Sequence, residues 1–119
     1  MNYIEALKQR YSVKKFNKKL QLSRENLAPI LEAGKLSASS LGLQPYRILV
    51  VESEELKEKL IPAFYNPSQI STCSHLLVLL SRRNVEQHSI DGYFKHITEF
   101  RQTPPEHLLG FKKTVDKHL

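Results

Sequence analysis

Basic side chains that could bind an anion are concentrated near the N-terminus. Six of them fall within residues 8–19, a stretch that contains no acid: Lys8, Arg10, Lys14, Lys15, Lys18 and Lys19. Ser12 adds a hydroxyl group, and Tyr11 and Phe16 add two aromatic rings. A charge run of this kind is more often a solvated face than a binding site. The pattern therefore leaves two interpretations open, a local anion site and an ordinary basic surface.

The net charge of the chain favours anionic partners but does not show which kind of anion is bound. A charge of +6 favours nucleic acid, phosphorylated cofactors or other polyanions. Residues 10–16 contain both basic and aromatic side chains and so have some of the character of a nucleic-acid module, but no complete nucleic-acid signature follows. A non-catalytic basic domain that binds nucleic acid or another polyanion through residues 8–19 is one hypothesis that the sequence supports.

Several other kinds of site are not indicated by the sequence. The four glycines are too dispersed for a G-x-G-x-x-G or P-loop phosphate site, and no serine stands in a G-x-S-x-G elbow. The single cysteine, Cys73, excludes an intramolecular disulfide and a thiolate zinc cluster. No two of the five histidines have the spacing of three or four residues that a local metal site uses. We therefore predict no metal site and no catalytic nucleophile.

The elements that must position the basic residues are mostly helices. A capping box of Asn2 and Glu5 predicts a helix over residues 3–9, directly before the basic segment. An apolar stripe predicts a long helix over residues 86–101. Further helix starts are predicted after Ser23, after Ser53 and at residues 103–106. A serine-rich loop is expected over residues 37–45.

Three local details of these elements are also predicted. Pro29 lies beyond the first turn of its helix, so it should kink the helix or shift its start. Leu56 and Leu60 should form the buried side of the helix after Ser53. The Asn66–Pro67 pair indicates a turn.

Two strands are predicted, over "YRILVV" and "HLLVLLS". Both are continuous aliphatic runs, so each is expected to be covered on both faces in a layered architecture of helices and strands. Two strands alone make a marginal sheet, and the last helix has no stop signal before Leu119. We therefore expect one domain over residues 1–119 that is part of a larger fold or completes its sheet with another subunit. No signal peptide or membrane span is predicted, which suggests a cytoplasmic protein.

Three segments in order give the chain a resemblance to the flavin-dependent nitroreductase family. They are "RYSVKKF" after a short helix, "SASSLGLQPY" before the first strand, and "YNPSQISTCSHLLVLL" leading into the second. Each segment alone is a weak match, but together they cover roughly residues 3–81 in the family's order and spacing. The resemblance implies an α+β fold, with three α/β/α layers around a mostly antiparallel sheet. The family's second half has no counterpart before Leu119, so the chain looks like the N-terminal part of such a domain.

The resemblance implies that the chain binds FMN and assigns roles to individual residues. Arg10 matches a position that contacts the phosphate, and Ser12 lies in the same region. Lys14 would reach the ribityl or pyrimidine side of the flavin, and Asn66 would hydrogen-bond the pyrimidine edge. Gln69 stands near the flavin where many relatives have a basic residue. Lys15 has no such match and is interpreted as solvated.

The serine loop carries the second set of implied contacts. Ser37, Ser39 and Ser40 lie in the loop that, in the family, reaches the flavin of the opposite subunit, so a homodimer is implied. Ser37 and Ser40 could equally be simple turn or capping residues. Gln44, Pro45 and Tyr46 look like the anchor of the loop rather than contacts to the substrate.

The activity implied by the resemblance is an FMN-dependent oxidoreductase that uses NADH or NADPH. A hydride would pass from nicotinamide to the flavin, and then to a small-molecule acceptor such as a nitroaromatic or a quinone. No membrane and no specific nucleic acid would be a partner. A third hypothesis is a truncated fragment that keeps dimer contacts but has no cofactor.

Overall fold

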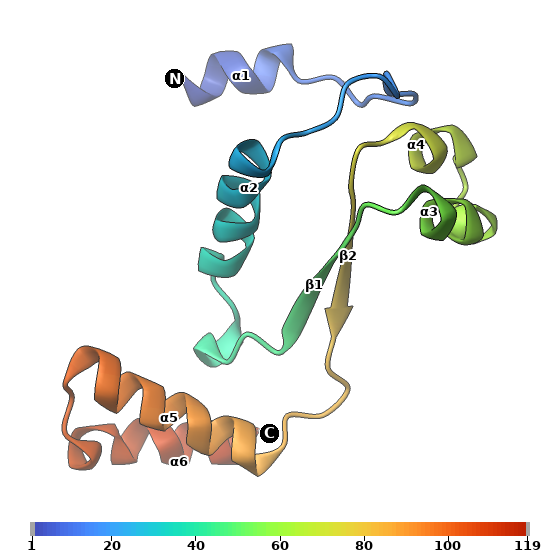
Figure 1. Ribbon diagram of the computed structural model, residues 1–119. Coiled ribbons are helices and arrows are strands. Elements are labelled where there is room, and N and C mark those ends of the chain that lie inside the picture. The colour runs from blue at the N-terminus through green and yellow to red at the C-terminus, as the bar shows by residue number, and fades with distance from the viewer. Residues whose placement is uncertain (1, 119) are drawn as a thin grey trace. The chain divides into compact units, whose positions relative to one another are not determined.

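Helices dominate the computed structural model, which describes residues 2–118 (Figure 1). In chain order the elements are α1 (Tyr3–Gln9), α2 (Arg24–Leu36), the 3₁₀ helix η1 (Ser40–Gly42), β1 (Tyr46–Val51), α3 (Glu54–Leu60), the 3₁₀ helix η2 (Ile61–Ala63), α4 (Pro67–Thr72), β2 (Leu76–Ser81), α5 (Gln87–Arg101), the 3₁₀ helix η3 (Pro105–Leu108) and α6 (Leu109–His118). The chain divides into two compact units. The N-terminal unit contains residues up to 32 and residues 48–78, and the C-terminal unit contains residues 33–47 and those from 79 onward.

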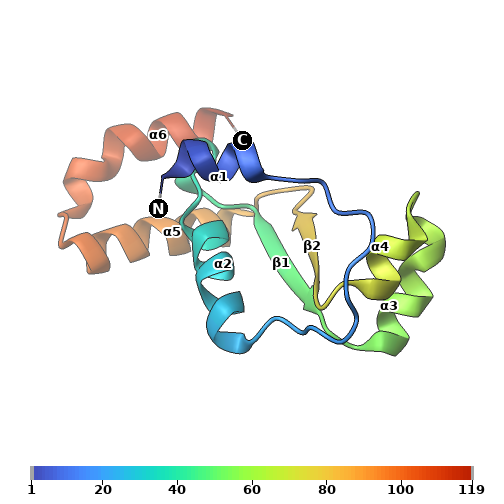
Figure 2. The same ribbon diagram turned by 90° about the horizontal axis from the view of Figure 1, so that it is seen from above.

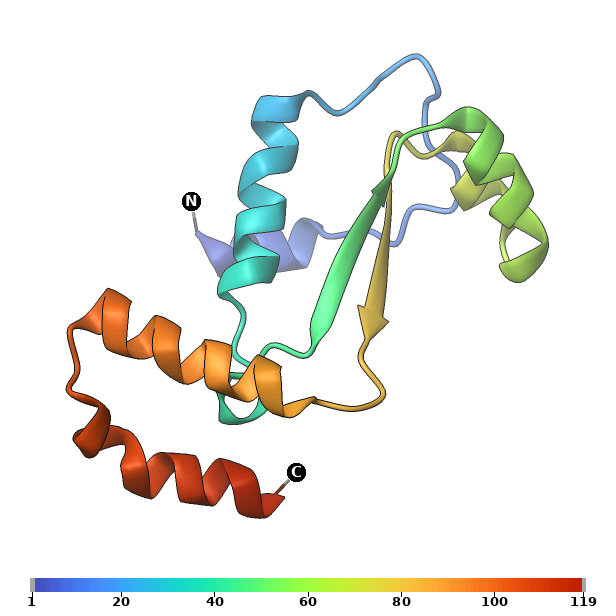
Figure 3. The ribbon, with the colours of Figure 1, turned by 60° about the horizontal axis from the view of Figure 1, so that its bottom comes forward.

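The two strands form an antiparallel pair (Figure 3). Just beyond the paired strands, the Arg82 amide donates to the Pro45 carbonyl at 2.8 Å. A helical connection between strands often indicates parallel pairing, but here α3 and α4 lie beyond the ends of the strands (Figure 1). The chain can therefore turn back on itself. This confirms the strand direction that the resemblance implied.

The expectation that both faces of the strands are covered is wrong for the described residues. Leu49 is 47% exposed in β1 and Leu79 is 72% exposed in β2. Among the described residues, none in either strand is buried. An aliphatic run predicts a preference for burial, whereas the burial itself depends on the elements that pack against the strand.

Helix α2 follows Ser23 as predicted and continues through Pro29. The helix begins directly after Ser23, whose carbonyl accepts from the Leu27 amide at 2.9 Å, so Pro29 does not shift its start. Proline has no N–H, so only the bond that residue 29 would have donated is missing. Leu27 is the buried residue of this helix.

The prediction for the buried side of α3 is wrong for Leu56 and is met only in part by Leu60, which is half-buried. Leu56 is 50% exposed, while the neighbouring Lys57 is 0% exposed. Helices α3 and α4 lie side by side in the N-terminal unit (Figure 2), and Lys57 is enclosed because its ammonium finds polar partners there. Burying a charge is costly unless it is paired and hydrogen-bonded, which is the condition that Lys57 meets.

The Asn66–Pro67 pair begins a helix, so the prediction of a turn at this pair is wrong. The Asn66 side chain accepts from the Ser68 amide at 3.1 Å and caps α4, and Pro67 is the first helical residue. Proline is well tolerated at that position, because its missing N–H would have no partner within the helix. Ile70 and Thr72 are the buried residues of α4.

Helices α5 and α6 form an antiparallel pair in the C-terminal unit (Figure 3). The predicted stripe of α5 is confirmed, since Ile90, Phe94 and Ile97 are buried. Val115 of α6 is 0% exposed and packs with Ile90 and Phe94. Among the described residues, no helix has the length and apolar character that crossing a membrane requires.

Gly42 lies in a conformation that only glycine adopts easily. Its φ is +72°, and a Cβ atom there would lie 2.5 Å from the Tyr93 hydroxyl oxygen. We expect Gly42→Ala to lower the free energy of unfolding by about 2 kcal/mol, from backbone strain and the displaced tyrosine. Urea unfolding would measure the change.

Gly92→Ala is the matched control for this substitution. Gly92 lies within α5, and a Cβ atom there would meet nothing within 4 Å. Alanine should therefore stabilise the helix by about 0.5–1 kcal/mol. Equal effects of the two substitutions would contradict the assignment of Gly42.

Candidate functional site

The basic segment begins where α1 ends. The Arg10 amide donates to the Leu7 carbonyl at 3.3 Å, and Arg10 itself has extended backbone angles that direct the chain out of the helix. Arg10, Ser12 and Lys14 are all exposed. The Lys14 ammonium donates to the Ser12 hydroxyl oxygen at 3.3 Å. A hydroxyl group and an ammonium, two and four residues after Arg10, therefore come together.

Ion pairs separate the basic residues of this segment into two groups. Two of the six are paired with acids: Lys8 with Glu5 at 3.0 Å and Lys18 with Glu54 at 3.9 Å. Within residues 2–118, the other four have no carboxylate partner: Arg10, Lys14, Lys15 and Lys19. Their charges therefore remain available to an external anion, which is what a phosphate site requires.

Gln69 is brought to the basic segment by α4. Its side-chain amide nitrogen donates to the Val13 carbonyl at 2.5 Å, between Ser12 and Lys14. Asn66 lies one turn earlier and is half-buried. Its carboxamide oxygen caps the helix, and its amide nitrogen has no hydrogen-bond partner within residues 2–118. That nitrogen remains able to donate to a ligand.

A cavity of about 530 Å³ lies beside the basic segment, within the N-terminal unit. Apolar side chains make up most of its lining, including Phe16, Leu20, Leu27 and Ile30. The apolar residues offer no donors to a phosphate, and of the polar ones in the lining, Gln21 donates to the Lys18 carbonyl and Ser74 contacts His75. An anion is therefore expected on the Arg10 side of the segment rather than in this cavity.

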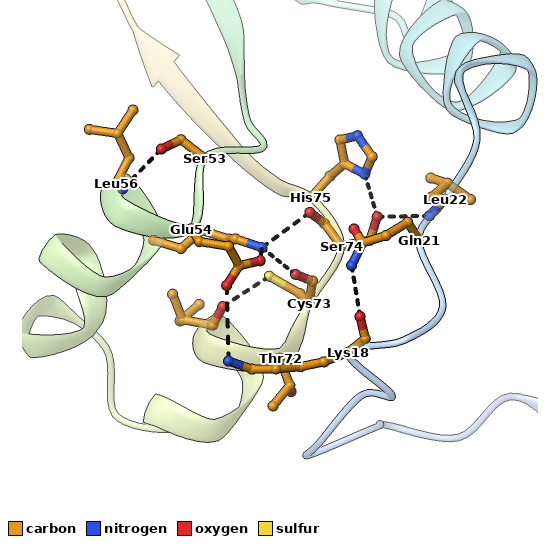
Figure 4. Close-up of polar contacts among 12 residues, drawn as sticks. Lys18, Gln21, Leu22, Ser53, Glu54, Leu56, Thr72, Cys73, Ser74 and His75 are labelled. Carbon is orange, nitrogen blue, oxygen red and sulfur yellow. Dashed lines mark hydrogen bonds and ion pairs between the residues drawn. The ribbon is translucent and has the colours of Figure 1, made fainter.

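A buried ammonium fixes the chain where α4 meets β2 (Figure 4). Lys57 donates to Glu54 Oε1 at 2.7 Å and to the carbonyls of Cys73 and Ser74 at 2.7 and 3.3 Å. The hydrogen bond from Lys57 lowers the pKa of Glu54 below its ordinary value. Sequence reasoning missed this cluster, and only the i,i+3 spacing of Glu54 and Lys57 hinted at it.

The serine loop belongs to the C-terminal unit, and its hydroxyl groups serve partly to hold the loop together. The Ser37 hydroxyl donates to the Ala33 carbonyl at 2.9 Å. The Ser39 hydroxyl oxygen accepts from the Gln44 amide at 2.8 Å. Ser40 is exposed at the start of η1.

The prediction that Gln44 and Tyr46 anchor the serine loop is confirmed. The Gln44 side-chain amide donates to the Lys35 carbonyl at 2.6 Å. The Tyr46 hydroxyl donates to the Gly34 carbonyl at 2.9 Å. Both contacts fasten the loop to the C-terminal end of α2, so its conformation is set by side chains that flank it.

Comparisons with known proteins place these features in a family. The model of the nitroreductase family matches residues 7–99. A Staphylococcus haemolyticus protein, provisionally named an NAD(P)H nitroreductase, is 41% identical over 95 residues, which are 79% of this chain and 43% of that protein. The chain spans about half the length of the curated relatives it matches.

Solved structures agree with the comparison of sequences. A nitroreductase-like protein of Streptococcus mutans has a TM-score of 0.84 at 19% identity, covering 98% of this chain and 56% of its own, and so supports the fold. An Exiguobacterium sibiricum protein, provisionally named a nitroreductase and solved in complex with FMN, has a TM-score of 0.79 at 27% identity. It covers 99% of this chain and 56% of its own. These neighbours confirm the predicted α+β fold. Because the family model matches most of its residues, the chain belongs to the nitroreductase family.

Proposed function

We propose that this protein is an FMN-dependent oxidoreductase that carries reducing equivalents from NAD(P)H to a small acceptor such as a nitroaromatic or a quinone. Membership of the nitroreductase family supports the reaction class. The name of the staphylococcal relative supports the donor, and the FMN complex of the Exiguobacterium neighbour supports the cofactor. We further propose that residues 1–119 correspond to the N-terminal part of a nitroreductase-like domain.

One observation about the chain's own residues carries the proposal. Arg10, Ser12 and Lys14 are exposed within a segment that contains no acid, and the Lys14 ammonium already contacts the Ser12 hydroxyl. Asn66 keeps an amide nitrogen with no partner among residues 2–118. The Arg10 guanidinium and the Ser12 hydroxyl fit the phosphate of FMN, the Lys14 ammonium fits the ring side, and a carboxamide fits the pyrimidine edge of the ring. The donor set therefore matches both ends of this cofactor.

Each of these residues would have a distinct task. The Arg10 guanidinium would bind the phosphate through paired hydrogen bonds, and Ser12 would add a hydroxyl contact. The Lys14 ammonium would stabilise negative charge on the ring side, and Asn66 would orient the ring. When bound, FMN would supply hydride transfer between the nicotinamide donor and the acceptor. No side chain of this chain needs to act as a nucleophile.

The serine loop, residues 37–45, is the segment on which we base the proposal of a homodimer. We propose that the loop with Ser37, Ser39 and Ser40 reaches the FMN of a second subunit in a homodimer. The anchoring of the loop by Gln44 and Tyr46 supports this, because a contact made across a subunit boundary requires a loop of fixed shape.

Titration with FMN tests the assignment of the phosphate end. We expect Arg10→Ala to weaken FMN binding about tenfold or more, since a charge-assisted bidentate contact is lost. Lys15→Ala is the matched control, because Lys15 is also exposed and basic but has no assigned contact. Quenching of flavin fluorescence measures both affinities. Equal weakening by the two substitutions would show that only general charge attracts the ligand.

A further inference from the structure

Three hydrogen bonds join residues 13–22, a stretch that begins within the basic segment, to the chain that runs from α4 into β2. The Gln69 amide nitrogen donates to the Val13 carbonyl at 2.5 Å. The Phe16 amide donates to the Thr72 hydroxyl oxygen at 2.9 Å, and the Leu22 amide donates to the Ser74 hydroxyl oxygen at 2.8 Å. Each bond links residues more than fifty positions apart. Residues 69–74 therefore act as a support on which residues 13–22 are held.

The support is itself fixed from behind. Thr72 is buried, and its hydroxyl donates to the Ser68 carbonyl one turn back in α4. The buried Lys57 ammonium holds the Cys73 and Ser74 carbonyls. A donor on such a support has little freedom to move, so it can determine where its partner lies.

Gln69 is the member of the support whose hydrogen bond lies among the proposed cofactor contacts. The carbonyl that it holds belongs to Val13, which is half-buried and stands between the exposed Ser12 and Lys14. Without this bond, the first tie between the segment and the support would be at Phe16, beyond Lys14. Both exposed side chains would then stand on a freely moving chain.

We propose that Gln69 is a positioning residue, which fixes the backbone between Ser12 and Lys14 instead of contacting the cofactor directly. Its role toward FMN rests on the proposed function, whereas its role in holding the segment does not. Pre-ordering a loop removes an entropic cost that the ligand would otherwise meet on binding. Gln69 would thus raise the affinity for FMN through the loop.

Substitution by methionine tests this role, because methionine has a similar length and no amide donor. In the cofactor-free protein, we expect Gln69→Met to speed hydrogen exchange about threefold to tenfold at the Phe16 amide, as a hydrogen bond that holds the loop is lost. FMN binding should weaken by a similar factor, measured by fluorescence titration.

Gln21→Met is the control for the loss of a glutamine amide. The Gln21 amide donates to the Lys18 carbonyl at 3.0 Å, inside the same loop and without any link to α4. It should change neither the exchange at Phe16 nor the affinity for FMN.

Two results would overturn the positioning role: weaker FMN binding with unchanged exchange, which would indicate direct contact, or no change in either quantity. Failure of the unsubstituted protein to bind FMN would instead reject the proposed function. The exchange measurement on cofactor-free protein would still decide whether Gln69 holds the segment.

Discussion

Lys57→Met is expected to lower the free energy of unfolding by about 2–3 kcal/mol, because two backbone carbonyls lose their donor. The Lys57 side chain is 1% exposed, and its ammonium donates to the carbonyls of Cys73 and Ser74 as well as to Glu54. Methionine fills a similar volume but offers no donor. Urea unfolding followed by circular dichroism would measure the loss.

Lys59→Met is the control, since Lys59 lies on the same helix, is 67% exposed and pairs with Glu55 at 2.5 Å. An exposed pair contributes little, so this substitution should cost no more than about 0.5 kcal/mol. Similar losses in the two variants would contradict the special role of Lys57.

The Lys57 cluster also has a consequence at acid pH. The hydrogen bond from Lys57 lowers the pKa of Glu54 in the folded protein. The ionised Glu54 therefore contributes to the stability of the fold at any pH above the pKa that it has in the unfolded chain. This contribution is lost as the pH falls through the folded pKa. The stability of Lys57→Met should therefore fall less steeply on the acid side than that of the parent protein.

Phe94→Ala is expected to lower the free energy of unfolding by about 3 kcal/mol, through lost burial and the cavity that remains. Phe94 packs with Ile90 and Val115 in the C-terminal unit, and its ring centroid lies 5.4 Å from that of Phe111. The Lys112 ammonium lies 5.4 Å from the centre of the same ring. Urea unfolding would measure this loss too.

Phe100→Ala provides the comparison on the same helix. Phe100 is 78% exposed in α5, so removing its ring should change stability by less than about 1 kcal/mol. A loss for Phe94→Ala that did not exceed the loss for Phe100→Ala would show that Phe94 is not part of a stabilising core.

Local sequence signals were sufficient for most of the helices and for both strands. The spacing of Ile90, Phe94 and Ile97 predicts the buried stripe of α5, because an apolar repeat and a helical period coincide there. The Asn66–Pro67 pair was ambiguous, since the same two residues can form a turn or begin a helix. The burial of Lys57 could not be predicted, because it depends on carbonyls 16 and 17 positions away.

The residues of the candidate site can be predicted from the types and order of residues in the sequence. Arg10, Ser12 and Lys14 stand out because an acid-free basic segment and the order of three motifs single them out. The bond from Gln69 to Val13 could not be predicted, because a glutamine and a carbonyl 56 positions apart leave no local pattern. Sequence therefore indicates which donors are present, and tertiary contacts decide what holds them.

The visible absorption spectrum of the purified protein, before and after incubation with FMN, tests the central proposal most directly. We expect flavin absorption bands that remain with the protein through desalting, and a cofactor that heat releases and mass spectrometry identifies as FMN. A colourless protein that retains no FMN after incubation, and that binds DNA in a salt-sensitive manner, would contradict the proposal and favour a basic domain that binds polyanions.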